Sequence, residues 1–141
     1  MKFLIDTNVV LDYFLRREPF YADSSKVILL SEKEYIEGFV SASSVTDIFY
    51  IAERNLKDSG IVRKMLEKLL KTIRVAAVGE KTIHEALDLK WKDFEDSVQY
   101  STAQGIWVDY IITRDSKHFN DSQIKAISPK ELLDLITNAK V

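Results

Sequence analysis

The sequence lacks cysteine and has only two prolines and four glycines among its 141 residues. The absence of cysteine excludes disulfides, thiolate metal sites and a cysteine nucleophile. The scarcity of proline and glycine argues against a disordered or loop-rich chain. Long apolar runs are also missing, since none reaches the roughly 18 residues that a membrane span requires. Lys2 leads directly into a strand-like run that contains Asp6, so we expect no signal peptide and a cytoplasmic protein.

A strong net charge is absent as well. The 20 Lys and Arg residues nearly balance the 22 Asp and Glu residues, and a net charge of −2 gives no overall attraction to nucleic acid. One stretch is nevertheless rich in bases: Arg54, Lys57, Arg63, Lys64, Lys68, Lys71 and Arg74. These residues form either the solvated face of a helix or a basic flank for a phosphate backbone or an acidic partner.

What the sequence does contain is an alternation of short apolar runs with helical patterns. Strands are predicted at residues 2–5, 39–40, 74–78, 110–113 and 124–127, and helices occupy the intervals and follow the last strand. The clearest helix, residues 59–73, carries apolar residues at alternating spacings of one and three. The helix at 80–91 is expected to turn Ile83, Leu87 and Trp91 inward.

This alternation predicts one α/β domain over residues 1–141. Strand–helix–strand units form parallel sheets that helices cover on both faces. We therefore expect a three-layer α/β/α sandwich with a central, mostly parallel sheet of four to five strands. Ligands of such sheets bind beyond the carboxyl ends of the strands. The residues directly after each strand are thus the first candidates for a site.

Acidic residues occupy several of these places. Asp6 comes directly after the first strand and Asp115 shortly after the fourth. Asp47 is the only charge in "VSASSVTDIFYIA", which runs from the second strand into a helix, and it lies off the apolar stripe of that helix. Asp96 opens a later helix. Each acid could instead be a helix cap or a turn residue, but together they would converge on one rim of the sheet.

Carboxylates that converge without a cationic partner repel one another, so such a rim requires a counter-cation. Hard oxygen ligands favour Mg²⁺ or Mn²⁺. The two histidines, His84 and His118, are far apart in the sequence and are interpreted as structural residues, on a helix surface and in a loop. Asp12 is interpreted as a helix residue near the rim, with a role in the site left open.

The segments that hold these acids resemble the signature segments of the PIN-domain family. They are "FLIDTNVVLDYF", "SSVTDIFYI", "DFEDSVQYSTA" and "YIITRDSKHF", which occur in the family's order and cover nearly the whole chain. The opening DTN and the late TRD are the specific parts. Members of the family are mostly Mg²⁺- or Mn²⁺-dependent ribonucleases, and many are VapC-like toxins of toxin–antitoxin pairs. The resemblance implies the PIN-like fold and this activity.

Carried over by position, the resemblance implies a catalytic set of four acids: Asp6, Asp47, Asp96 and Asp115. Asp6, Asp96 and Asp115 would hold the metal, and Asn8 and Thr113 match supporting positions. Asp93, Glu95 and Asp12 are second choices. Two departures stand out: the second acid is more often Glu in this family, so a water could intervene at Asp47, and His118 stands where many toxins carry Asp.

The leading hypothesis is therefore a metal-dependent endoribonuclease, in which a bound cation activates water for in-line attack on a phosphodiester. RNA is the expected substrate, an antitoxin protein is a candidate partner, and the resemblance implies a homodimer. The alternatives are an RNA-processing nuclease that is not a toxin and a non-catalytic PIN-like binding domain. A phosphohydrolase with an aspartyl nucleophile generally carries a second Asp two positions on, where this chain has Asn8.

Overall fold

A computed structural model describes residues 1–33 and 35–139 of the chain; residues 34, 140 and 141 of the predicted domain lie outside this description. Five strands form one sheet in the order β3-β2-β1-β4-β5, and every pairing is parallel. The strands are β1 (Lys2–Ile5), β2 (Glu37–Ser41), β3 (Arg74–Ala76), β4 (Tyr110–Ile112) and β5 (Lys125–Ile127). The predicted parallel sheet is confirmed.

Helices occupy the connections between the strands. They are α1 (Thr7–Phe14), α2 (Tyr21–Leu30), α3 (Ala42–Leu56), α4 (Ser59–Leu69), α5 (Glu80–Leu89), α6 (Phe94–Gly105) and α7 (Pro129–Ala139), with a short 3₁₀ helix η1 (Ser116–Phe119) between β4 and β5. Within the described part of the chain, no helix has the length and apolar character needed to cross a membrane.

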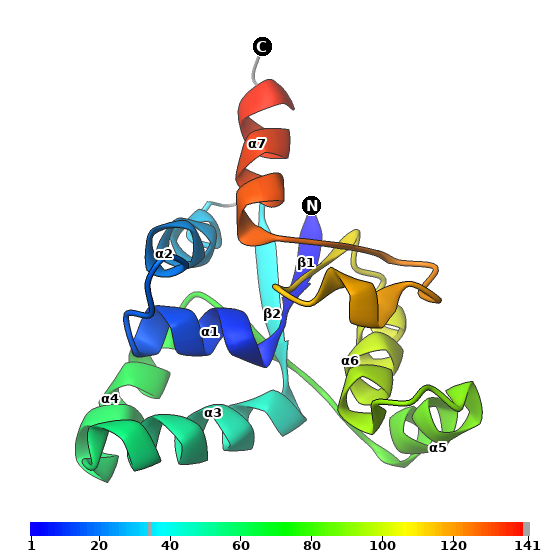
Figure 1. Cartoon of the computed structure of the whole chain (residues 1–141), viewed down its shortest axis with the longest axis horizontal. Coiled ribbons are helices and arrows are strands. Elements are labelled where there is room, and N and C mark those ends of the chain that lie inside the picture. The colour runs from blue at the N-terminus through cyan, green and yellow to red at the C-terminus, as the bar shows by residue number, and fades with distance from the viewer. Residues whose placement is uncertain (34, 140–141) are drawn as a thin grey trace.

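The alternation of side chains along the strands creates two apolar clusters. Phe3 and Ile5 of β1 belong to the cluster completed by α1, α2, α3, α4 and α7, whereas Leu4 packs on the other face with residues of α6 and η1. Figure 1 shows the same division, with α1 to α4 on one side of the sheet and α5 and α6 on the other. The predicted three-layer sandwich is confirmed.

Two helices end earlier than predicted. α4 ends at Leu69, and α5 ends at Leu89 because Lys90 adopts a left-handed conformation with φ 56°. The inward position predicted for Leu87 is wrong: Leu87 is 55% exposed, and the small neighbouring Ala86 is the buried residue of α5. Trp91 does pack inward, but from the connection after α5, where its ring stacks on Tyr100 of α6.

Candidate active site

The candidate site lies at the carboxyl ends of β1 and β4, where the order of the strands reverses. β2 and β3 follow on one side of β1, while β4 and β5 lie on the other. Such a reversal leaves a crevice beyond the two central strands, where ligands of parallel α/β sheets bind. Asp6 directly follows β1, and its backbone N–H donates to the carbonyl of Ile112 at 2.9 Å. Both central strands therefore position Asp6.

Asp6 is buried, and uncharged donors surround its carboxylate. Oδ2 accepts a hydrogen bond from the Thr113 hydroxyl at 2.7 Å, and Oδ1 accepts from Gln99 Nε2 at 3.1 Å and from the Thr7 backbone N–H at 2.8 Å. Burial raises the pKa of Asp6 above its ordinary value, although these hydrogen bonds oppose the shift, and the charge of Asp115 adds to it. Neutral hydrogen-bond donors thus hold this carboxyl group in place.

Asn8 and Thr113 connect Asp6 to Asp115. The side-chain amide of Asn8 donates to Asp115 Oδ2 at 3.0 Å and lies 3.5 Å from Asp6 Oδ2. Thr113 Oγ1 accepts from the backbone N–H of Asp115 at 3.0 Å while its hydroxyl donates to Asp6. The structure therefore brings these four predicted residues together, with Asp115 at the exposed edge of the site.

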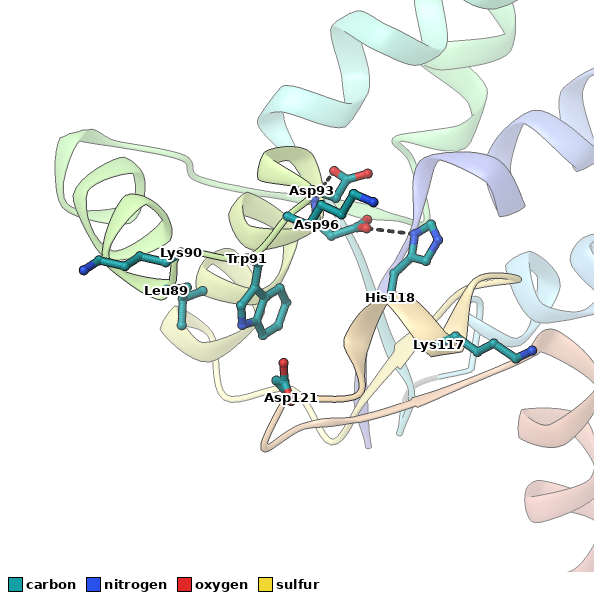
Figure 2. A pocket seen from close by; sticks show the side chains of 9 residues that line it. Leu89, Lys90, Trp91, Asp93, Asp96, Lys117, His118 and Asp121 are labelled. Atoms are coloured by element: carbon teal, nitrogen blue, oxygen red, sulfur yellow. Dashed lines mark hydrogen bonds and ion pairs between the residues drawn. The ribbon is translucent and has the colours of Figure 1, made fainter.

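The amino-terminal end of α6 brings a third acid to the site. Asp93 caps this helix by accepting the backbone N–H of Asp96 at 3.1 Å, and the buried Asp96 places Oδ2 2.9 Å from His118 Nδ1 (Figure 2). Burial, together with the charges of Asp93 and Asp6, raises the pKa of Asp96 from 3.8 to about 6, and the contact with His118 only partly offsets this. Candidate ligand atoms of Asp93, Asp96 and His118 all lie within 4.8 Å of one another.

Asp47 on α3 and Glu95 on α6 complete the group from exposed positions. Burial raises the pKa of Glu95, and the charges of Asp47, Asp6 and Asp93 raise it further. These carboxylates therefore lie within electrostatic range of one another. We call the whole group the acidic rim: Asp6, Asp47, Asp93, Glu95, Asp96 and Asp115.

Asp12, the remaining second choice, is engaged behind the rim. Its side chain is fully buried, Oδ2 accepts from Arg114 Nε at 2.6 Å, and Oδ1 accepts from Arg114 Nη2 at 3.1 Å. Arg17 Nη1 lies 3.9 Å from the same Oδ1. The guanidinium of Arg114 also covers the ring of Phe20, with Cζ 4.0 Å from the ring centroid. Asp12 therefore anchors the segment that carries Thr113 and Asp115.

Gln99 is a residue of the site that the sequence analysis did not identify. It is buried, and Nε2 donates both to Asp6 Oδ1 and to Ser44 Oγ at 2.9 Å, which links α6 to α3 across the site. The sequence does carry one signal for Gln99. This residue comes three positions after Asp96, so both side chains lie on the same side of a helix whose pattern predicts inward packing.

His118 has a contact that its place in the sequence does not reveal. The interpretation of this residue as a structural loop residue misses the pairing with Asp96, because η1 folds back against α6. His84, by contrast, lies on the exposed surface of α5, as expected.

The donors of the acidic rim fit a divalent cation. Carboxylate oxygens are the ligands that Mg²⁺ and Mn²⁺ prefer. Burial and the charges of neighbouring carboxylates raise the pKa values of Glu95 and Asp96, and a bound positive charge would relieve the part that comes from repulsion. His118 adds an imidazole beside Asp96, and imidazole suits transition metals better than Mg²⁺.

The chain is thus a parallel α/β sandwich with carboxylates gathered where the strand order reverses. This places it in the class of α/β domains with an acidic site. Within that class, the sequence model described as "PIN domain" matches residues 2–117, and the chain belongs to the PIN domain family.

Proteins similar to this chain have low sequence identity to it. The chain is 21% identical over 138 residues to Ribonuclease VapC1 of Aquifex aeolicus, covering 94% of each protein. A solved toxin–antitoxin complex from Klebsiella pneumoniae has a chain that is 19% identical, with a TM-score of 0.67 over 89% of this chain and 96% of that one. FitAcB from Neisseria gonorrhoeae is 17% identical, with a TM-score of 0.70 over 91% of this chain and 98% of that one.

Proposed function

We propose that this protein is a divalent-metal-dependent endoribonuclease and the toxin component of a toxin–antitoxin pair. The observation that carries the proposal is the geometry of Asp6, a buried carboxylate held by three neutral donors beside further acids. Metal-binding carboxylates are typically oriented by hydrogen bonds of this kind. Membership of the PIN domain family and the likeness to Ribonuclease VapC1 support RNA phosphodiester bonds as the substrate.

The proposed cation is Mg²⁺ or Mn²⁺, which would lower the pKa of a water and offset the charge of the phosphodiester when bound. Its proposed ligands are Asp6, Asp96 and Asp115, with Asp47 acting directly or through a water. Asp93 and Glu95 are the alternatives, because both belong to the acidic rim.

The neighbours of these ligands have orienting roles. Asn8 and Thr113 keep Asp6 and Asp115 in a fixed relation through their hydrogen bonds. Gln99 presents its amide to the other oxygen of Asp6, so both carboxylate oxygens of Asp6 are directed. The protein thus supplies a pre-oriented acidic centre, to which the scissile phosphodiester is brought.

RNA cleavage by the purified protein tests the nuclease. We expect cleavage with Mg²⁺ or Mn²⁺, none with EDTA, and a loss of at least about a hundredfold in Asp6→Asn, beyond the loss typical of residues that only orient a metal ligand. Asp134→Asn, an exposed aspartate of α7, is the matched control and should cleave like the wild type. Equal rates for Asp6→Asn and the wild type would refute the proposal.

Growth of expressing cells tests the assignment as a toxin. We expect growth arrest on expression of the wild type and normal growth with Asp96→Asn, because the arrest requires the acidic centre. Metal-dependent cleavage without arrest would instead favour an RNA-processing nuclease.

Two further observations test the proposed partners. A small antitoxin-like reading frame beside the gene would supply the proposed protein partner, and the size of the purified protein in solution would test the proposed homodimer.

A further inference from the structure

A cavity of about 830 Å³ opens beside the acidic rim, between the α5–α6 connection and η1 (Figure 2). Asp93 and Asp96 of the acidic rim line this cavity, together with His118. A molecule in this cavity would therefore lie next to the proposed metal ligands. The cavity is large enough for a nucleotide, since ligand pockets are commonly 300–1,000 Å³.

Trp91 supplies the apolar wall of this cavity. Its ring stacks on Tyr100, with centroids 4.9 Å apart and planes 22° apart, and meets Phe119 edge-on at 6.2 Å. These contacts fix the indole from behind, while the partly exposed ring still borders the cavity. A rigid aromatic surface of this kind is a platform on which an unpaired base can stack.

The charged groups around Trp91 also suit a nucleotide. Lys90 and Lys117 are exposed on opposite sides of the cavity, and their side chains extend outward (Figure 2). Together with Lys92, which also lines the cavity, these lysines place positive charge around its mouth, and this charge attracts the phosphate backbone of an RNA strand that enters it. Asp121 lies at the foot of the cavity with its carboxylate directed toward Trp91 (Figure 2), where it can accept a hydrogen bond from an exocyclic amino group.

We infer that this cavity is a subsite for one unpaired, amino-bearing base of RNA, stacked on Trp91. The inference rests on the proposed function, because an RNA molecule that places one base in this cavity presents a neighbouring phosphodiester to the acidic rim. Bases of duplex RNA are already paired and stacked, so they cannot enter. Cytosine meets the carboxylate of Asp121 with an amino group, whereas uracil presents a carbonyl oxygen at the same position.

Binding of a labelled short oligocytidylate to Asp6→Asn, which should leave the RNA intact, tests the subsite. Adding Trp91→Ala should weaken binding by about tenfold to a hundredfold, the range of base–aromatic stacking, while Trp91→Phe should retain most of the affinity. Trp107→Ala is the matched control, because Trp107 is 85% exposed and precedes β4, at the opposite end of the strands. Unchanged affinity in Trp91→Ala would overturn the inference.

A second measurement leaves Trp91 in place, because its removal could disturb the packing on Tyr100. Trp91 and Trp107 are the two tryptophans of the sequence, so Trp107→Phe makes Trp91 the sole indole reporter. We expect oligocytidylate to quench its fluorescence strongly, oligouridylate to require severalfold higher concentration, and duplex RNA to have no effect. Unchanged emission at saturating oligocytidylate, or equal affinity for both oligomers, would contradict the inference.

These outcomes are separable from those of the proposed function. Quenching of Trp91 in a protein whose wild type cleaves no RNA would refute the nuclease and retain the subsite. If RNA cleavage requires Asp6 but proceeds at the same rate in Trp91→Ala, the subsite is refuted and the nuclease is retained.

Discussion

Asp6 and Asp12 are both buried acids of one short segment, yet their surroundings differ. Asp6 is met by a hydroxyl, an amide and a backbone N–H, all of them neutral. Asp12 is met by the guanidinium of Arg114 through two hydrogen bonds. Neutral donors orient a carboxylate and leave its negative charge available to a bound cation. A guanidinium that binds both carboxylate oxygens instead neutralises that charge. The difference separates an acid of the site from an acid that supports the fold.

The largest expected effect on stability is that of breaking the pair behind the rim. Asp12→Asn leaves the guanidinium of Arg114 without its carboxylate, and losing one partner of a buried pair typically costs 3–5 kcal/mol. Because the side chain of Arg114 is 28% exposed, we expect a loss of about 3 kcal/mol, measured by urea unfolding.

Two variants sharpen this comparison. Asp12→Leu combined with Arg114→Met should recover most of the lost stability, because it removes both charges at once. Asp6→Asn should change stability by less than about 1 kcal/mol, since an amide replaces a carboxylate whose ionisation burial already disfavours. Equal losses in Asp6→Asn and Asp12→Asn would contradict the distinction between the two acids.

A smaller effect is expected from pH in the metal-free protein. Folded Asp96 keeps its proton up to about pH 6, whereas the unfolded chain loses it near 3.8, so the folded state binds more protons in this interval. The free energy of unfolding should therefore fall as pH rises from about 4 to 6, by on the order of 2 kcal/mol. Asp96→Asn should flatten this slope in pH-dependent unfolding. Stability of the wild type that rises over the interval would contradict the assignment.

A small change in stability is also predicted when one donor to Asp6 is removed. Thr113→Val keeps the shape of the side chain but removes the hydroxyl that binds Asp6 Oδ2 at 2.7 Å. We expect a loss of about 1 kcal/mol in urea unfolding and a roughly 10- to 100-fold loss of Mn²⁺ affinity by calorimetry. Thr113→Ser retains the hydroxyl and should bind Mn²⁺ like the wild type. Full affinity in Thr113→Val would show that the hydroxyl does not orient Asp6.

The architecture could be predicted from the sequence because its signals are local. Apolar runs such as residues 2–5 mark the strands, and Asp6 and Asp115 follow two of those strands directly in the chain. Parallel pairing then brings these strand ends to one edge of the sheet. The four signature segments placed Asp47 and Asp96 in the same predicted set.

The partners of these acids could not be predicted, because they depend on contacts between distant parts of the chain. Gln99 meets Ser44 from 55 residues away, and Arg114 meets Asp12 from 102 residues away. Nothing local to Asp12 distinguishes an acid that ligates a metal from one that pairs with a guanidinium. The position of His118 likewise depends on the path of η1.

Calorimetric titration of Mn²⁺ at pH 6 tests the central claim most directly. The wild type should bind Mn²⁺ and release protons, because Asp96 is partly protonated at this pH and must lose its proton to become a ligand. The variant with Asp12→Leu and Arg114→Met should bind similarly, and Asp6→Asn should show no binding. Binding by Asp6→Asn as tight as that of the wild type would contradict the claim that the acidic rim around Asp6 is a metal centre.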